Sequence, residues 1–289
     1  MFDKSSSKHA KGVVALIVLA FGFGVIAITA RYLSSYYTLF QQLYLSVGLA
    51  FIVSLFIFPR SLSIKRLKKL PKRDWYVILF RVIIGYALAA SLYRQALILT
   101  KISNVTFIQS IPFAGVFGWI LFKEKFSFTK LLLLLVAYFG VVLIAVKDYS
   151  SLNSIGLGEI FSLISAALFA LSYLSRKWQS DILTNMEITQ VILLVGTVIL
   201  LAISLLKGEG LPSFSFNLLL FLSLFFTGLF NAINIFLINY GFRNVKAVLA
   251  SNILTLESVF ALILAIIFYQ EFPNVKELIG GKVKTIALK

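Results

Sequence analysis

The sequence contains no cysteine and a single histidine, His9, which lies in the polar N-terminal tail. The absence of cysteine excludes disulfides, thiol catalysis and thiolate metal sites, and it leaves the redox compartment open. With its one imidazole in the tail, the chain cannot build a histidine metal cluster or a serine–histidine pair inside a fold. Paired-aspartate and H-E-x-x-H motifs are also absent. We therefore expect no enzyme, no metal and no cofactor.

Charged residues are scarce as well. They make up 13% of the 289 residues, whereas 60% of the chain is apolar and the mean hydropathy is +0.97. An ordinary soluble domain is about 45–50% apolar and roughly 25% charged. A membrane-spanning helix needs about 20 predominantly apolar residues, and such runs recur along this chain with short polar interruptions. The composition predicts an all-α integral membrane protein.

Nine clear spans can be read from the apolar runs, and a tenth is short or atypical. The nine are residues 12–30, 37–58, 76–99, 104–122, 129–146, 157–173, 188–206, 218–238 and 247–269. After Pro273 the chain carries Lys282, Lys284 and Lys289. Because a charge near the centre of a membrane helix costs several kcal/mol, with estimates from about 3 upward, we expect the tenth segment to be a stub or a tilted half-span.

Basic residues concentrate in alternate loops, of which residues 59–75 are the longest and most basic. A net charge of +16 would suggest a nucleic-acid partner in a soluble protein, but alternation between loops is the pattern of membrane topology. We expect no nucleic acid, contacts with membrane lipids, and a multi-pass protein of the cytoplasmic (inner) membrane. The loops that share a side with the N-terminus hold most of the lysine and arginine, which predicts a cytoplasmic N-terminus.

An internal duplication links the two halves of the sequence. Residues 104–124 are echoed by residues 252–271, and each copy is an apolar segment closed by a glutamate, Glu124 or Glu271. The copies lie about five helices apart, an odd number, so consecutive halves enter the membrane from opposite sides. This predicts an inverted repeat of five transmembrane helices, with repeats at 12–147 and 156–289. Inverted repeats are typical of secondary transporters.

At these residues the sequence resembles the drug/metabolite transporter superfamily, specifically the ten-helix permeases built from two five-helix EamA-type repeats. The matching positions are Arg81, Ala96, Leu97, Pro112, Gly118, Trp119, Glu124, Gly156 to Glu159, Leu256 to Phe260, and Glu271. Two features depart from the family pattern. Ser258 stands where the second repeat usually has proline, and Gln41, Gln42 and Tyr44 occur where the second helix often has arginine.

Glu257 is the sharpest candidate for function, because it is the acidic residue placed deepest in any span. At about 1.5 Å per residue it lies near the bilayer midplane, where an ionisable residue usually marks a functional site. The alternative is a glutamate hydrogen-bonded between helices. Arg94 lies well inside the third span, where it could pair with Glu257, bind an anionic substrate group, or snorkel to the surface. Arg81 is expected to be an interface anchor.

Polar residues form a stripe on the eighth span. Thr227, Asn231 and Asn234 fall at i, i+4 and i+7 and so share one helical face. Such a stripe lines a polar pocket or joins neighbouring helices. Tyr86 and Tyr93 lie one heptad apart on the third span and could form aromatic walls of a pocket or pack in the core.

A second stripe lies on the fourth span. Thr106, Gln109 and Ser110 share one face there, and Pro112 then interrupts the backbone hydrogen bonds. Broken helices at the midplane often mark binding sites. Glu159, near the start of the sixth span, is expected to have a structural role, as are Glu124 and Glu271.

Together these features predict a secondary transporter that moves a small-molecule substrate, a metabolite or amphiphile, by alternating access. The cavity is expected between the third, fourth, eighth and ninth helices, and proton coupling through Glu257 and assembly into a homodimer are left open. Two alternatives remain. An intramembrane enzyme would need catalytic groups at depth, and a non-transporting membrane scaffold would have tightly packed polar residues and no cavity.

Overall fold

The computed structural model describes residues 4–59, 61–109, 111, 113–123, 156–213 and 217–273. Every regular element in these ranges is a helix. The elements are α1 (Lys4–Leu33), α2 (Leu39–Ile57), α3 (Ile64–Lys68), α4 (Lys72–Val82), η1 (Ile83–Ala90), α5 (Ser91–Leu99), α6 (Ile102–Gln109), α7 (Phe113–Phe122), α9 (Leu157–Leu174), η2 (Ser175–Trp178), α10 (Asn185–Leu206), α11 (Leu218–Asn244), α12 (Ala247–Leu254) and α13 (Leu256–Tyr269).

Eight helical stretches in these ranges are long and apolar enough to cross a membrane. Each stretch overlaps one of the predicted spans, although the stretch that matches 247–269 begins only at Asn252. The predicted span 129–146 and the tenth segment lie outside the described residues. The all-helical, multi-span fold class is thus confirmed.

Local sequence signals set several helix starts. Thr184 and Glu187 form a capping box at the start of α10: Glu187 N donates to Thr184 Oγ1 over 3.3 Å and Thr184 N donates to Glu187 Oε2 over 2.8 Å. Asn217 caps α11 by accepting a hydrogen bond from Leu219 N over 2.9 Å. These bonds satisfy amide groups that a helix start leaves without partners.

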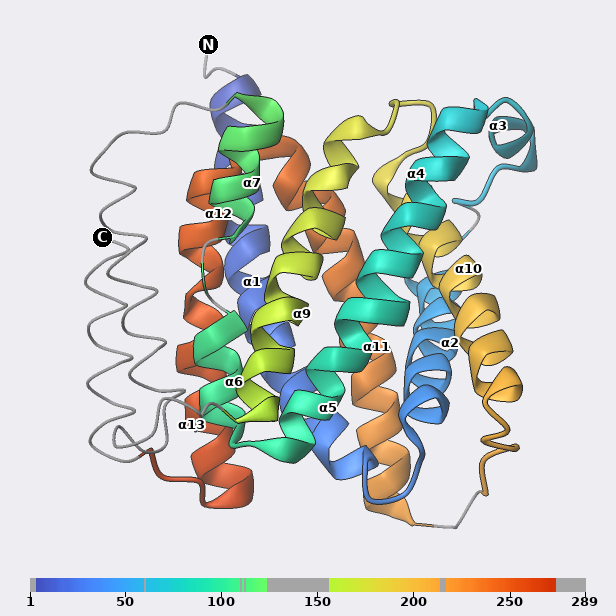
Figure 1. Ribbon diagram of the computed structural model, residues 1–289. Helices are drawn as coiled ribbons and strands as arrows, with labels where there is room; N and C mark the ends of the chain where they lie inside the picture. Colours follow the sequence, from blue (N-terminus) through green and yellow to red (C-terminus); the bar gives the residue numbers. More distant parts are fainter. Residues whose placement is uncertain are drawn as a thin grey trace.

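The two halves are oriented in opposite directions. Figure 1 shows α1 running away from the N-terminal end of the molecule and α9, the first helix of the second half, running toward that end. Each of these helices packs mainly against the third spanning helix of the other half, α1 along α11 and α9 along η1 and α5. The inverted arrangement therefore interleaves the halves.

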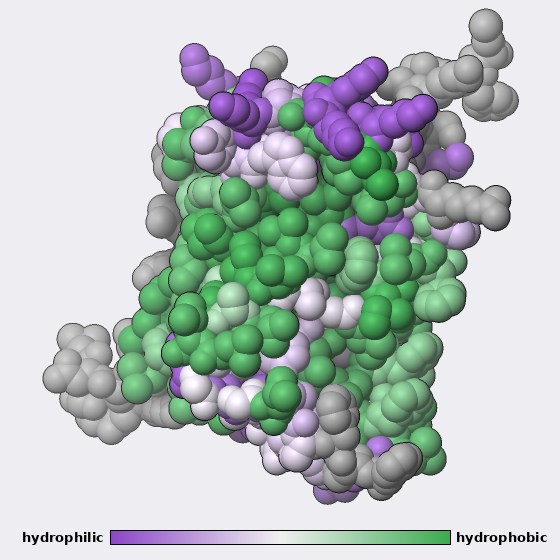
Figure 2. Space-filling model, turned by 90° about the vertical axis from the view of Figure 1, so that its right-hand side faces the viewer, coloured by the Kyte–Doolittle hydropathy of each residue, from purple (hydrophilic) through white to green (hydrophobic). Residues whose placement is uncertain are grey.

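Large apolar side chains cover the outer surface, which a water-soluble protein would bury. Phe56 is 80% exposed, Phe221 66% and Ile267 64%. Figure 2 shows a broad apolar belt on one face, with hydrophilic side chains gathered at the end that carries α3. That end also holds the N-terminus (Figure 1). Such a belt suits contact with lipid chains.

The third spanning helix is not a continuous α-helix. Its middle, Ile83–Ala90, is a π-helix, and two serines of α9 donate hydrogen bonds to one carbonyl just before it and one within it. Ser172 Oγ donates to Arg81 O over 3.2 Å and Ser165 Oγ donates to Ala89 O over 2.8 Å. Because π-helical turns are rare and often lie at functional sites, the space beside this segment is a candidate functional site.

Two further spans are divided. The fourth comprises α6, ending at Gln109, and α7, beginning at Phe113, whereas Pro112 lies outside the described residues. The ninth is divided at Thr255, where hydrogen bonds three residues apart replace the usual four-residue spacing: Thr255 N donates to Asn252 O, and Ser258 N donates to Thr255 O. The sequence predicted an interruption in the fourth span but a continuous ninth.

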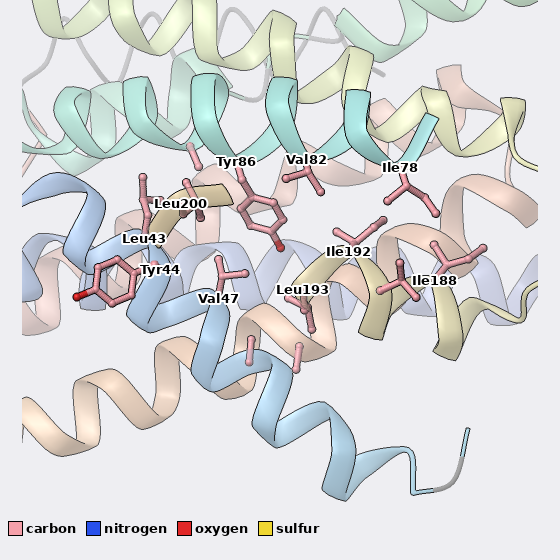
Figure 3. Packing of buried hydrophobic residues seen from close by; sticks show 14 of the residues in the cluster. Leu43, Tyr44, Val47, Ile78, Val82, Tyr86, Ile188, Ile192, Leu193 and Leu200 are labelled. Carbon is pink, nitrogen blue, oxygen red and sulfur yellow. The ribbon is translucent and has the colours of Figure 1, made fainter. Parts of the chain in front are cut away.

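Apolar side chains of both halves pack together around the π-helix. Figure 3 shows Tyr86 of η1 extending between Val47 of α2 and Ile192 of α10, all members of one buried cluster. These residues also border the cavity described next.

Candidate functional site

A cavity lies between the two halves. Its wall contains residues of α1, α2, the α4–η1–α5 helix and α6 from the first half, and of α9, α10, α11, α12 and α13 from the second. The centres of water-sized spheres can occupy about 120 Å³ of it. One buried water needs only about 10–15 Å³ by this measure, so the space suits a small molecule.

The structure brings the predicted site residues together, apart from one. The cavity is lined by Glu257, Arg94, Asn231, Asn234, Gln109, Tyr86 and Tyr93. Ser110 lies outside the described residues. That these side chains bind a substrate stays a prediction, and what the structure establishes is that they share one space.

Arg94 is buried, with only 5% of its surface exposed. Its Nη1 donates to Gln42 Oε1 over 2.9 Å and its Nη2 donates to Ser46 Oγ over 3.2 Å. Snorkelling to the surface is therefore wrong for this residue. It does not pair with Glu257 either, since its partners are these two neutral groups. Gln42, a departure from the family pattern, acts here as a guanidinium anchor.

Arg81 lies in the cavity wall and not at the membrane interface. The interface-anchor interpretation is wrong, because Arg81 is only 4% exposed and lines the cavity. Its Nη1 donates to Gln179 Oε1 over 2.8 Å, and its Nη2 donates to Asn239 Oδ1 over 2.7 Å. Both partners belong to the second half. A position near the end of an apolar run gives no sign of this, since the partners Gln179 and Asn239 are distant in the sequence.

Aromatic rings form one wall of the cavity. Tyr93 meets Phe169 edge-on with ring centroids 6.1 Å apart, Phe169 stacks on Tyr173 at 5.6 Å, and Tyr173 stacks on Phe23 at 6.2 Å. All four line the cavity. Among 28 Phe and 12 Tyr, sequence reasoning identified only Tyr93 of this wall.

The amide side chains differ in how they are used. Gln109 Nε2 donates to Ser162 O over 3.1 Å, which joins α6 to α9, and Asn231 Nδ2 donates to Thr227 O over 3.0 Å. Neither side-chain atom of Asn234 has a partner, although the residue is 2% exposed. The Tyr86 hydroxyl also lacks one. A buried polar group left without a hydrogen bond costs about 1–3 kcal/mol, so these atoms are available to a ligand.

Asn234 is held against α1 by a glycine. A Cβ atom at Gly22 would lie 2.2 Å from Asn234 Oδ1, a distance that would force the amide to move. The close approach of α1 and α11 at the cavity therefore requires glycine, which has no side chain, at position 22.

Glu257 lies in the first turn of α13, immediately after the division at Thr255, and is 7% exposed. The positive end of a helix favours a carboxylate there. A helix that begins at membrane depth needs protein or a cavity, and not lipid, beside its first amide groups. The division of the ninth span fits this rule, because Glu257 lines the cavity.

Polar contacts join the two halves at the end of the molecule away from the N-terminus. Glu159 accepts from Thr100 Oγ1 over 2.5 Å and from Asn104 Nδ2 over 3.4 Å. Glu271 pairs with Arg31 and accepts from Ile102 N over 2.9 Å. These contacts agree with the structural roles expected for the two glutamates, whereas Glu124 lies outside the described residues.

We expect Gly85→Ala to destabilise the protein, because a Cβ atom there would lie 2.6 Å from Ser172 Oγ. Overpacking of this kind costs about 1–3 kcal/mol. Ser172→Ala removes that oxygen, so the double variant should lose less stability than the two single losses added together. Unfolding in detergent micelles measures the four proteins of this cycle, and simple additivity would contradict the proposed steric contact.

Comparison with known proteins relates the chain to a protein family and to solved structures. The family model described as the EamA-like transporter family matches residues 10–146 and 156–287. A solved structure described only as "Crystal structure of protein" is similar with a TM-score of 0.73 and 13% identity, covering 97% of this chain and 96% of its own. At that identity the likeness shows the fold alone. No curated protein matches.

Proposed function

The chain belongs to the EamA-like transporter family, and from this premise we propose that it moves a small metabolite or amphiphile across the membrane by alternating access around the central cavity. In this proposal Glu257 is the group that takes up and releases a proton. We also propose that the N-terminus and the basic α3 end face the cytoplasm, on the charge distribution of the loops.

One observation carries the proposal: the cavity lies between two oppositely oriented repeats and is lined by charged and polar side chains from both. Arg94 comes from the first repeat and Glu257 from the second. Two similar halves around a midplane site can rock so that the site opens to one side at a time.

The contacts between the repeats support the same motion. At one end Thr100 of the first repeat donates to Glu159 of the second. Toward the other end Arg81 of the first repeat donates to Gln179 and Asn239 of the second. When one repeat rocks against the other, the hydrogen bonds at one end break and those at the other end remain.

The two alternatives have less support. A scaffold with no transport activity would have packed polar residues, but here Asn234 and Tyr86 line open space with side-chain atoms that lack partners. An intramembrane enzyme needs a nucleophile with a base, paired acids or metal ligands. Among the described lining residues Glu257 is the sole carboxylate, and histidine and cysteine do not occur there.

Reconstitution in liposomes tests the proposal. The purified protein should accelerate the flux of at least one member of a broad panel of radiolabelled metabolites over that of empty liposomes. Asn234→Leu fills the cavity and removes its amide, so the flux should fall roughly tenfold or more, as expected for loss of a buried polar contact. Asn244→Leu, on the same helix outside the cavity lining, is the matched control. Folded protein that moves nothing in the panel would overturn the proposal.

A further inference from the structure

We infer that the cavity accepts a small organic anion, a compact monocarboxylate with an apolar or aromatic body, whose negative group binds the guanidinium of Arg94. Arg81 offers a second guanidinium toward the α3 end of the same cavity. The inference rests on the proposed function, because it names the class of substrate that the transport site would take.

Uncompensated positive charge is the first argument. A guanidinium stays protonated in a protein at any physiological pH. Arg94 and Arg81 are 5% and 4% exposed, and each is held by neutral partners alone, which are side-chain amides and a hydroxyl. Within the part of the chain that the structure describes, neither has a carboxylate close enough to form an ion pair. Neutral anchors orient a guanidinium but do not balance its charge.

Four other described arginines do have a counter-ion, and one of them, Arg176, is just as buried, at 2% exposed. The pairs are Arg31 with Glu271, Arg66 with Glu187, and Arg176 and Arg243 with Asp181. The two arginines that line the cavity differ from these in lacking one. A buried charge is stable when it is paired, so the missing partner is expected to come from the ligand.

Free donors are the second argument. A guanidinium carries five N–H donors, and the hydrogen bonds to the anchors use two nitrogens of each residue. Arg81 Nε is buried without a partner. Arg94 is fixed by Gln42 and Ser46 of α2, so its remaining donors are pre-oriented. A carboxylate can accept two parallel hydrogen bonds from such a fork.

The charge balance selects against cations. Two guanidiniums and one carboxylate, Glu257, line the described wall, and neither arginine forms an ion pair with that carboxylate. An organic amine in this space would face two positive groups and one negative group, whereas a monoanion faces the opposite balance. Like charges brought together in a site of low polarity disfavour the wrong ligand strongly.

The rest of the wall describes the body of the ligand. The stacked rings of Phe169 and Tyr173 with the edge of Tyr93 offer an apolar, aromatic surface. Asn234 and the Tyr86 hydroxyl can receive one neutral polar group. The volume of about 120 Å³ open to water-sized spheres favours a compact molecule over a long lipid.

Matched ligands that differ in charge alone test the inference. The probes are 3-phenylpropionate, 3-phenylpropanamide and 3-phenylpropylamine, with 4-methylpentanoate and its amide and amine as a second series. Binding to the detergent-solubilised protein is measured by calorimetry and by the rise in melting temperature, which reports binding to the folded state. We expect at least one carboxylate to bind roughly tenfold or more tightly than its amide, as a charge-assisted hydrogen bond implies, and its amine to bind no better than the amide.

Variants assign the preference to Arg94. Arg94→Gln should reduce the affinity for the carboxylate to that for its amide and leave the amide unchanged. Arg73→Gln removes the same charge from the exposed basic end and should change neither affinity. Arg94→Lys keeps the charge without the fork and should retain part of the preference, which maintains the test if Arg94→Gln does not fold.

Three results would overturn the inference: amides or amines that bind as tightly as the carboxylates, no carboxylate binding in either series, or an Arg94→Gln protein with an intact preference. Transport is measured separately in liposomes. Carboxylates that bind but are not moved would overturn the transport proposal and leave the anion site standing. Flux of neutral or cationic metabolites without carboxylate binding would overturn the anion site and leave the transport proposal standing.

Discussion

Glu257→Gln is expected to abolish substrate flux driven by a pH gradient while the protein remains folded and inserted. Glutamine has the shape and the hydrogen-bonding capacity of protonated glutamate but cannot release a proton. Glu257 is the one carboxylate among the described residues of the cavity wall, and it is buried in the first turn of α13. If it carries the coupled proton, its replacement leaves the pH gradient with no group on which to act.

Liposomes with an imposed pH gradient provide the measurement. Gradient-driven uptake by the Glu257→Gln protein should equal that of empty liposomes, whereas exchange of substrate on both sides of the membrane should continue. Asp181→Asn is the matched control, because its side chain is 70% exposed at the protein surface and its flux should keep the wild-type pH dependence. An unchanged pH dependence in Glu257→Gln would reject the coupling role.

A disulfide that joins the repeats at either end is expected to stop transport. Two glycine contacts offer the positions. A Cβ atom at Gly158 would lie 3.1 Å from Thr100 Cβ, and one at Gly12 would lie 3.3 Å from Asn244 Cβ. Disulfides have Cβ–Cβ distances of about 3.5–4.5 Å, so a small shift permits each bond. Since alternating access separates helices at one end in each state, flux should fall roughly tenfold or more in either oxidised pair.

The natural sequence contains no cysteine, so each pair can be introduced without background thiols. Reductant should restore the flux, which separates the constraint from damage caused by the substitutions. Each single-cysteine variant is the control and should transport at the same rate with and without oxidant. Oxidised pairs that transport normally would show that the repeats do not part at these contacts.

The spans were predictable because the membrane imposes a length and an apolar composition on each helix. The deep polar residues could be identified for the same reason, since a charged side chain such as Glu257 stands out against an apolar segment. Helical periodicity then placed Asn231 and Asn234 on one face. These inferences use local properties of the chain alone.

The features that were not predicted depend on contacts between distant segments. Ser165 and Ser172 of α9 donate hydrogen bonds to one carbonyl within the π-helix of the third span and one just before it. No pattern within residues 76–99 encodes these contacts. The position of Arg81 in the cavity follows from partners in the second repeat, Gln179 and Asn239. The aromatic wall joins rings from three helices that are individually ordinary in an apolar chain.

The π-helix also makes the two repeats mechanically unequal. In the second repeat α11 is a regular α-helix from Leu218 to Asn244. In the first repeat the π-helix η1 interrupts the corresponding helix. If its π-helical turns convert to α-helical turns, Tyr93 and Arg94 in α5 rotate about the helix axis. We therefore expect α11 to stay rigid beside the cavity and the shape changes to concentrate in the helix that contains η1. The inward-open and outward-open forms would then not be related by the symmetry of the two repeats.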